Sequence, residues 1–299
     1  MKRVIVRTLC VSLLVAATTV TQVPTPAVAA SKATYYLALG DSVAQGGQPI
    51  GGPFSPYASP GYNHGYPEEL LKLVYDGYEQ LRLENLACGG QSTRTVIEGA
   101  PWCPYPAGSQ LEQAEAFLEA HPGEVAFVTI TIGANDVIGT EADCLDDATI
   151  TFDLVCIQAQ LPSIQANLAE IVERLQAAAP GVPIVGSTYY NALLGAWVLV
   201  PGPVGQFLAS ASVAPVELLN TGIAVAYGAE GAAVADLYDA FDSTNFAEFV
   251  TSEWGLVPAN VANACTWTWF CSKQYPGDVH PNNTGHEVIA QAFAEALSS

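Results

Sequence analysis

Short apolar runs recur along the chain and alternate with segments of helical periodicity. The clearest run, "VAFVTITI" at 125–132, is apolar or β-branched at successive positions, which is typical of a parallel strand buried on both faces. This alternation predicts βαβ units and a parallel sheet in an α/β fold. Five strands are predicted, at Tyr35–Leu39, Arg82–Ala87, Val125–Ile132, Pro183–Thr188 and Ala232–Leu237.

Two helices have clear sequence signatures. One is predicted over Pro162–Ala179, where an apolar face at helical spacing is followed by the terminating sequence Ala-Pro-Gly at 179–181. The other begins at "TGHE", Thr284 to Glu287, which fits a capping box. Its inward face would carry Ile289, Phe293 and Leu297.

The mature chain is predicted to be a single domain over residues 31–299, because it contains no internal repeat and no low-complexity linker. Three long connections, at 98–112, 138–160 and 239–280, follow predicted strands, and the apolar segment 191–215 is a fourth. Ligands of open parallel sheets bind at the carboxyl ends of the strands. We therefore expect these segments to form the walls of a site.

The first 30 residues match a secretory signal peptide. Lys2, Arg3 and Arg7 precede an apolar run at 9–20, and small residues end the segment, with cleavage expected after Ala29 or Ala30. The run is too short for a membrane anchor and is interrupted by threonines, and no later segment is expected to span a bilayer. These features predict a secreted, monomeric protein without stable membrane insertion.

Charge excludes several partners. Removal of the leader would leave six Lys/Arg against 29 Asp/Glu, a formal net charge of −23. Such a surface repels phosphate backbones and anionic membranes, so we expect no nucleic-acid binding and a neutral substrate.

Six of the seven cysteines lie in the mature chain, and an even number in an exported protein indicates disulfides. Six cysteines allow fifteen pairings, among which the sequence does not choose. We expect nearest neighbours to pair, so that each bond closes a short loop. The spacing has no CxxC motif or histidine pair, which disfavours a metal site. The expected pairs are Cys88–Cys103, Cys144–Cys156 and Cys265–Cys271.

Residues suited to acyl transfer follow the predicted strands. The first strand runs into "GDS" at 40–42, where Gly40 permits a sharp turn and Ser42 would project from the carboxyl edge of the sheet. Gly90 follows the second strand, Asn135 follows the third, and His280 precedes the last helix. A serine nucleophile, a histidine base and N–H donors for an oxyanion are the groups that ester cleavage needs.

These motifs, in this order over residues 35–298, resemble the SGNH (GDSL-type) hydrolase family. The resemblance rests on "GDS" at 40–42, Gly90, "GAND" at 133–136 and His280. It implies a flavodoxin-like, three-layer α/β/α fold and hydrolysis of carboxylic esters without a cofactor or metal. It also implies that Ser42 is the nucleophile, that His280 is the general base, and that Ser42 N–H, Gly90 N–H and the Asn135 amide form the oxyanion hole.

The chain departs from the family pattern at two positions. Val43 replaces the usual leucine after the serine. The usual aspartate three residues before the histidine is Gly277, and the acid lies one position later, at Asp278. We expect a backbone carbonyl of residues 276–278 to orient His280 in a Ser–His dyad. In the alternative, Asp278 reaches the imidazole through a remodelled loop.

Several other residues admit more than one interpretation. Among the histidines, we expect His64 to lie in a loop, His121 to end a helix and His286 to contact loop or solvent. Asp236 is expected at a strand end, and "DLYDAFD" at 236–242 lacks a recognisable cation-loop pattern. The sequon "NNT" at 282–284 is interpreted as helix capping.

Two apolar segments indicate which kind of acyl chain the substrate carries. The aromatics Trp267, Trp269 and Phe270 would rim an acyl pocket or plug a small core, and Leu193–Val200 would line the pocket or be buried. These segments favour a lipid-like acyl chain. The alternatives are a phospholipase A, a carbohydrate acetylesterase, and a non-catalytic binding protein on an esterase-like fold.

Overall fold

The computed structural model describes residues 33–49, 64–78, 80–139, 141–146 and 148–299. The predicted signal peptide and its cleavage site lie outside the described residues.

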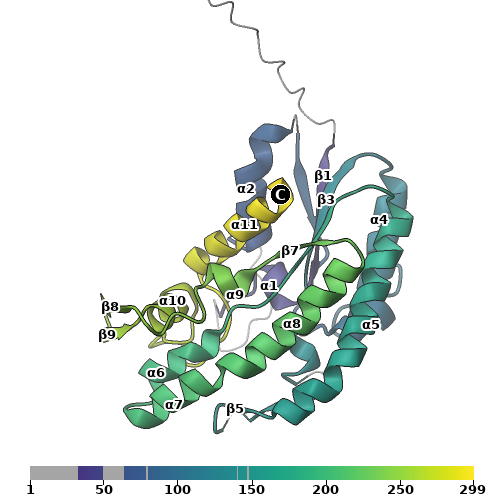
Figure 1. The fold of residues 1–299 in the computed structure, drawn as a ribbon. Coiled ribbons are helices and arrows are strands. Elements are labelled where there is room, and N and C mark those ends of the chain that lie inside the picture. Colours follow the sequence, from purple (N-terminus) through teal and green to yellow (C-terminus); the bar gives the residue numbers. More distant parts are fainter. Residues whose placement is uncertain (1–32, 50–63, 79, 140, 147) are drawn as a thin grey trace, which may run out of the picture.

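A five-stranded parallel sheet forms the centre of the molecule, as the sequence predicts (Figure 1). Its strand order is β2-β1-β3-β6-β7, the order of flavodoxin-like folds. Leu37, Leu39 and Ile130 are fully buried, because helices cover both faces of the sheet. The strands are β1 (Tyr35–Gly40), β2 (Arg82–Asn85), β3 (Val125–Thr131), β6 (Ile184–Ser187) and β7 (Ala233–Ala235).

Eleven α-helices are present in the described part of the chain. They are α1 (Ser42–Gln45), α2 (Tyr66–Val74), α3 (Thr93–Glu98), α4 (Gln110–Ala120), α5 (Leu154–Ala178), α6 (Ala196–Leu199), α7 (Pro203–Ala211), α8 (Val213–Ala229), α9 (Leu237–Ala240), α10 (Ala259–Trp267) and α11 (Asn283–Ser298). The described chain also contains three short 3₁₀ helices, which are η1 (Tyr75–Gly77), η2 (Ala134–Asp136) and η3 (Ala192–Gly195). Two antiparallel hairpins complete the structure: β4 (Leu145–Asp146) with β5 (Thr151–Phe152), and β8 (Phe249–Ser252) with β9 (Gly255–Pro258).

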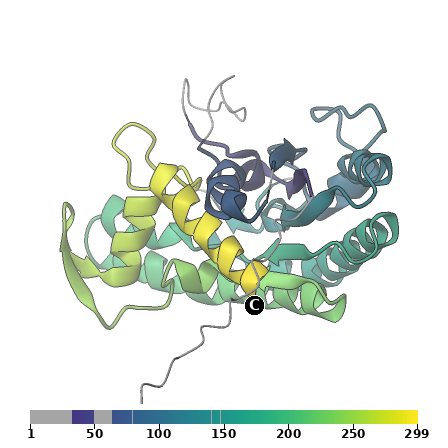
Figure 2. The ribbon, with the colours of Figure 1, turned by 90° about the horizontal axis from the view of Figure 1, so that it is seen from above.

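Neighbouring residues of β1 show how the helices form two outer layers. The ring of Tyr35 packs edge-on against Phe117 of α4, whereas the Tyr36 hydroxyl is 2.7 Å from Thr129 Oγ1. Tyr66 of α2 also reaches Thr129, so α2 covers the opposite face from α4. The helices α2 and α11 lie side by side in both views, and α4, α5 and α8 form the other layer (Figures 1 and 2).

The prediction for α5 is wrong at its start. The helix begins at Leu154, not at 162, and Pro162 lies in its interior. Asp153 caps it by accepting hydrogen bonds from the backbone of Val155 and Cys156.

The segment 203–229 contradicts the expectation that no segment after the leader is long and apolar enough to span a bilayer. It forms two consecutive helices, α7 and α8, which were not predicted, and its length and mean hydropathy (1.4) would allow it to cross a membrane. Half of its most apolar window is buried, and α8 packs along α5 as a layer of the fold.

The last helix also starts earlier than predicted. Asn282, and not Thr284, is its N-cap, accepting a hydrogen bond from the backbone N–H of Gly285 at 3.1 Å. This confirms the interpretation of 282–284 as a capping sequence.

The three nearest-neighbour disulfides are confirmed. Cys88–Cys103 joins the loop after β2 to the connection before α4, Cys144–Cys156 joins β4 to the first turn of α5, and Cys265–Cys271 closes the loop after α10.

Candidate active site

The turn after β1 requires a glycine. Gly40 has φ +131°, and a Cβ at this position would lie 2.0 Å from the carbonyl oxygen of Thr131. The buried side chain of Gln110 holds the same residue from both sides, accepting from Gly40 N–H at 2.7 Å and donating to its carbonyl at 3.0 Å. The turn that presents Ser42 is therefore fixed by backbone and side-chain contacts.

Asp41 caps the short helix α1, of which Ser42 is the first residue. One carboxylate oxygen accepts from Val43 N–H at 2.9 Å, and the other accepts from the Tyr189 hydroxyl at 2.6 Å. Burial raises the pKa of Asp41 to about 6, although both hydrogen bonds act in the opposite direction. Asp41 is thus a buried support beneath Ser42.

Ser42, His280 and Asp278 form a hydrogen-bonded chain. His280 Nε2 lies 2.9 Å from Ser42 Oγ, and its Nδ1 lies 3.0 Å from Asp278 Oδ1. Since a carboxylate only accepts, Nδ1 carries the proton and Nε2 can accept the serine proton. The arrangement suits a general base next to a nucleophile.

The expectation of an orienting backbone carbonyl is wrong. Gly277 has φ +85°, and the turn it permits directs the carboxylate of Asp278 back towards His280. The same oxygen accepts from the backbone N–H of His280 at 2.9 Å, which fixes its position. The His280 carbonyl in turn accepts from Trp269 N–H at 3.0 Å.

Asn135, on η2 after β3, lines the same cavity as Ser42 and His280. Its side-chain nitrogen donates to the Gln91 carbonyl at 2.9 Å. The next residue, Asp136, is buried and accepts from the backbone and the hydroxyl of Thr93. Burial raises the pKa of Asp136 to about 6. These contacts join the Asn135 loop to the start of α3.

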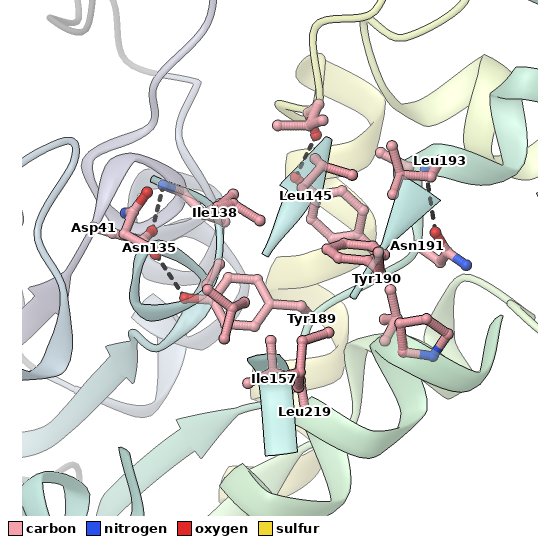
Figure 3. A pocket seen from close by; sticks show the side chains of 18 of the residues that line it. Asp41, Asn135, Ile138, Leu145, Ile157, Tyr189, Tyr190, Asn191, Leu193 and Leu219 are labelled. Atoms are coloured by element: carbon pink, nitrogen blue, oxygen red, sulfur yellow. Dashed lines mark hydrogen bonds between the residues drawn. The ribbon is translucent and has the colours of Figure 1, made fainter. Parts of the chain in front are cut away.

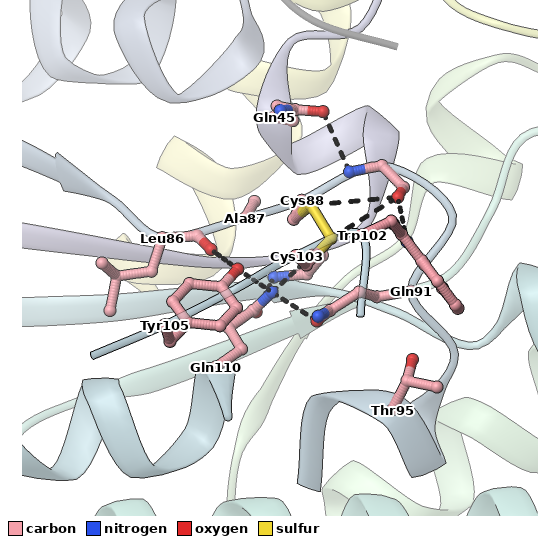
Figure 4. The surroundings of a disulfide bond; sticks show 12 residues. Gln45, Leu86, Ala87, Cys88, Gln91, Thr95, Trp102, Cys103, Tyr105 and Gln110 are labelled. Atoms are coloured by element: carbon pink, nitrogen blue, oxygen red, sulfur yellow. Dashed lines mark hydrogen bonds between the residues drawn. A yellow bond between two sulfur atoms is a disulfide. The ribbon is translucent and has the colours of Figure 1, made fainter. Parts of the chain in front are cut away.

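Gly90 is in a loop that is tied to its surroundings on both sides (Figure 4). The preceding residue, Gly89, donates its N–H to Gln45 Oε1 at 2.9 Å and accepts from Trp102 Nε1 at 3.1 Å. Gly90 itself has φ +78°, which favours glycine. It is not among the residues that line the cavity, and neither is Asp278.

A cavity of about 170 Å³ opens beside Ser42 and His280 (Figure 3). Most of its wall is aliphatic or aromatic. Its lining residues are Asp41, Ser42, Val43, Ala134, Asn135, Val137, Ile138, Leu145, Phe152, Ile157, Tyr189, Tyr190, Asn191, Ala192, Leu193, Pro215, Val216, Leu219, Val279 and His280.

The aromatic segment 267–270 lies away from this cavity. Phe270 is buried in the main core, Trp267 packs edge-on against Phe241, and Trp269 Nε1 donates to Gln48 Oε1 at 3.0 Å. None of the three is among the residues that line the described cavity. Phe270 and Trp267 belong to or pack against the main core, as the second interpretation predicts, whereas the half-buried Trp269 fits neither interpretation. In the segment 193–200, Leu193 does line the cavity, whereas Leu194 belongs to a second small core.

The remaining histidines are outside the cavity wall. His286 was expected to contact loop or solvent, but it is fully buried, and its Nδ1 accepts from Tyr66 N–H at 3.1 Å. Burial lowers the pKa of His286 to about 3. His64 pairs with Glu69, and His121 ends α4 as expected.

Asp236 ends β7 and caps α9, as expected for a residue that joins neighbouring loops. It also accepts from Thr188 Oγ1 at 3.0 Å. Within the described residues, no group of three or more His, Cys, Asp and Glu could hold a metal ion.

Two supporting residues were not identified from the sequence, namely Gln110 and Tyr189. Tyr189 lies two residues after the end of β6, so the strand-end rule that singled out Ser42 and Asn135 could have found it. Gln110 lies on the first turn of α4 within a predicted connection, and no local signal pairs it with Gly40.

Comparison with known proteins identifies the same family as the sequence motifs. The model of the GDSL-like lipase/acylhydrolase family matches residues 38–288. No curated protein matches the chain.

Solved structures share the fold at low sequence identity. An extracellular lipase from Streptomyces rimosus has 18% identity and a TM-score of 0.53, covering 88% of this chain and 100% of that one. A phospholipase A1 from Streptomyces albidoflavus has 19% identity and a TM-score of 0.50, and the match covers 88% of this chain and 99% of that one. An acetylxylan esterase from Geobacillus stearothermophilus has 17% identity and a TM-score of 0.51, and the match covers 90% of this chain and 96% of that one.

Proposed function

Since the chain belongs to the GDSL-like lipase/acylhydrolase family, we propose that it is a secreted serine hydrolase that cleaves carboxylic esters through an acyl-enzyme on Ser42. The observation that carries the proposal is the Ser42–His280–Asp278 chain of hydrogen bonds at the mouth of an apolar cavity. This is the geometry that activates a serine hydroxyl for attack on a carbonyl carbon.

In the first half of the reaction, Ser42 Oγ attacks the ester carbonyl carbon and its proton passes to His280 Nε2. The tetrahedral intermediate then collapses, the bond from carbon to the alcohol oxygen breaks, and Nε2 returns the proton to the leaving alcohol. In the second half, water gives a proton to Nε2 as its oxygen attacks the acyl carbon. The bond from carbon to Ser42 Oγ then breaks, Nε2 returns the proton to Oγ, and the carboxylic acid is released. Asp278 holds the ring and stabilises the transient imidazolium.

We assign the oxyanion hole to the backbone N–H groups of Ser42 and Gly90 and the side-chain amide of Asn135. Support comes from the family motifs and from the position of Ser42 and Asn135 on one cavity wall. The Asn135 amide has two N–H groups, and the one bonded to the Gln91 carbonyl fixes the direction of the other. Removing a donor of this kind typically costs roughly 10²–10³ in turnover.

Secretion is supported by the leader-like sequence at 1–30 and by the pairing of all six remaining cysteines in disulfides. The solved structures with this fold include enzymes for lipids and for acetylated xylan, so the fold does not select among these substrates. A phospholipase A, a carbohydrate acetylesterase and a non-catalytic binding protein remain the competing functions.

The proposal is tested by labelling the protein with a fluorophosphonate and locating the adduct by peptide mass spectrometry. We expect a single adduct on Ser42 and hydrolysis of p-nitrophenyl esters. Ser42→Ala should lose both, while Ser210→Ala, at an exposed serine of α7, should keep both. A wild-type protein that is neither labelled nor active would instead support the binding protein.

A further inference from the structure

The cavity that contains Ser42 and His280 has an extensive apolar wall. Its polar lining side chains include Asn135 and His280. Leu145, Phe152, Ile157 and Leu219 are among the apolar ones, and Figure 3 shows Ile157 and Leu219 next to each other. The apolar wall is therefore suited to a group that makes no hydrogen bonds.

The side chains of Tyr189, Tyr190 and Asn191 also line the cavity, but they do not change this conclusion, because the polar groups of each are hydrogen-bonded within the protein. The Tyr189 hydroxyl donates to Asp41 at 2.6 Å, and the Tyr190 hydroxyl donates to the Val279 carbonyl at 2.9 Å. Asn191 is hydrogen-bonded through both its oxygen and its nitrogen. Sugar hydroxyls placed here would lose hydrogen bonds to water without equivalent replacements.

One wall is a small hairpin that is held rigidly in place. Leu145 of β4 pairs with Phe152 of β5, and both side chains line the cavity. Cys144, next to Leu145, is joined by a disulfide to Cys156 of α5, which precedes the lining residue Ile157.

Two backbone bonds reinforce this position. Cys144 N–H donates to the Val137 carbonyl at 2.9 Å, and Asp153 N–H donates to the Cys144 carbonyl at 2.8 Å. The hairpin is thus tied to η2, which carries Asn135, and to α5.

We propose that this cavity binds the acyl chain of the ester, that it accepts linear aliphatic chains longer than acetyl, and that Leu145 and Phe152 of the β4–β5 hairpin set the preferred length. The proposal rests on the proposed function, since it names the substrate class of that same site. An acetyl group would leave most of the 170 Å³ unfilled. Each added methylene that is buried can raise kcat/KM by up to about fourfold.

The first test measures kcat/KM on p-nitrophenyl acetate, butyrate and octanoate, all as monomers in solution. For the wild type we expect octanoate to exceed acetate by about tenfold or more. Phe152→Ala should lower the octanoate value by about tenfold and leave acetate within about twofold. Val216→Trp, which fills the cavity from α8 at a half-buried position, should suppress octanoate hydrolysis selectively.

Phe249→Ala is the matched control. Phe249 lies on the other two-stranded hairpin, is 51% exposed and does not line the cavity. It should leave the ratio of octanoate to acetate unchanged.

The second test separates this inference from the proposed function. Binding of methyl octanoate to Ser42→Ala is measured by calorimetry, with and without Phe152→Ala. Labelled, active enzyme with no chain-length preference and no effect of Phe152→Ala would overturn the acyl site and leave the esterase standing. Phe152-dependent binding in a protein whose wild type is neither labelled nor active would support the chain site and reject the esterase.

Discussion

At the scale of single residues, the site depends on how the imidazole of His280 is held. Its Nδ1 faces a carboxylate that is itself fixed by the backbone N–H of His280, and the Asp278 side chain is only 17% exposed. A carboxylate so placed both selects the tautomer and stabilises the imidazolium, whereas a carbonyl would provide orientation alone.

Asp278→Asn tests this role. An amide can donate to Nδ1 and so favour the wrong tautomer, and we expect kcat to fall by about 10²–10⁴ with little change in KM. The measurement is steady-state hydrolysis of a p-nitrophenyl ester.

Asp236→Asn is the matched control, because the Asp236 carboxylate likewise accepts hydrogen bonds from neighbouring groups, but these belong to the start of α9 and to Thr188 and not to His280. It should cost about 1 kcal/mol of stability or less and leave kcat intact. If Asp278→Asn behaved like Asp236→Asn, the carboxylate would have no catalytic role.

The residues predictable from sequence are those whose role follows from their place in the chain. Ser42, Asn135 and His280 each lie at a strand end or before a helix, so they could be identified without a structure. The partners of Gln110 and His286, by contrast, are 70 and 220 residues away along the chain. Periodicity and local motifs contain no information about such pairs.

At the scale of elements, the helices and strands predicted correctly from the sequence are those in which buried positions are apolar and exposed positions are polar, or which are apolar throughout a short strand. The strand β3 was predicted from its apolar run, while α8 was missed because apolar residues lie on both its buried and its exposed sides, as Val225 shows. The start of α5 was misplaced because Leu154 and Val155 are exposed apolar residues that form no inward stripe.

The element with most influence on selectivity is the β4–β5 hairpin, and its disulfide can be removed. In Cys144→Ser/Cys156→Ser we expect a stability loss of about 3 kcal/mol, since the bond closes a short loop. The hairpin should also become free to move, so the kcat/KM ratio of octanoate to acetate should fall, while fluorophosphonate labelling of Ser42 persists. Thermal unfolding and the two ester assays measure these effects.

Cys265→Ser/Cys271→Ser provides the comparison, because neither cysteine adjoins a residue that lines the cavity, whereas Cys144 and Cys156 adjoin Leu145 and Ile157. It should lower stability and keep the ratio, even if kcat changes through the loop that contacts His280. An unchanged ratio in the Cys144→Ser/Cys156→Ser variant would show that the wall does not depend on the bond.

At the scale of the whole molecule, two buried carboxylates and a strongly negative surface affect stability in the same direction. Asp41 and Asp136 both have pKa values raised to about 6 by burial. The chain also carries a formal net charge of −20 at pH 7. Acidic composition was evident from the sequence, but the burial of these two side chains follows from the packing of α3 and Tyr189 around them.

The sign of the effect follows from proton binding. Between about pH 6 and pH 4 the folded protein takes up protons at Asp41 and Asp136, while the unfolded chain, with ordinary pKa values near 3.8, does not. The contribution of these two groups to stability therefore rises as pH falls through this range and is lost again as pH rises through 6. His286 acts in the opposite direction, because burial lowers its pKa to about 3 and the unfolded chain takes up a proton near pH 6.5 that the folded protein does not. The change in melting temperature between pH 7.5 and pH 5 is thus the sum of opposed contributions, and a carboxylate variant compared with the wild type isolates one of them, measured by calorimetry in about 1 M NaCl to screen surface charge.

Asp41→Asn isolates one of the two groups. Its amide oxygen can still accept from Val43 N–H and its nitrogen can donate to the Tyr189 hydroxyl, so the fold should persist. The difference in melting temperature, the pH 5 value minus the pH 7.5 value, should be lower than in the wild type, because the proton that Asp41 takes up is lost. Asp76→Asn, at an exposed carboxylate of η1, should leave that difference as in the wild type. An Asp41→Asn variant whose melting temperature changes between pH 7.5 and pH 5 by as much as that of the wild type would contradict the assignment of a raised pKa to Asp41.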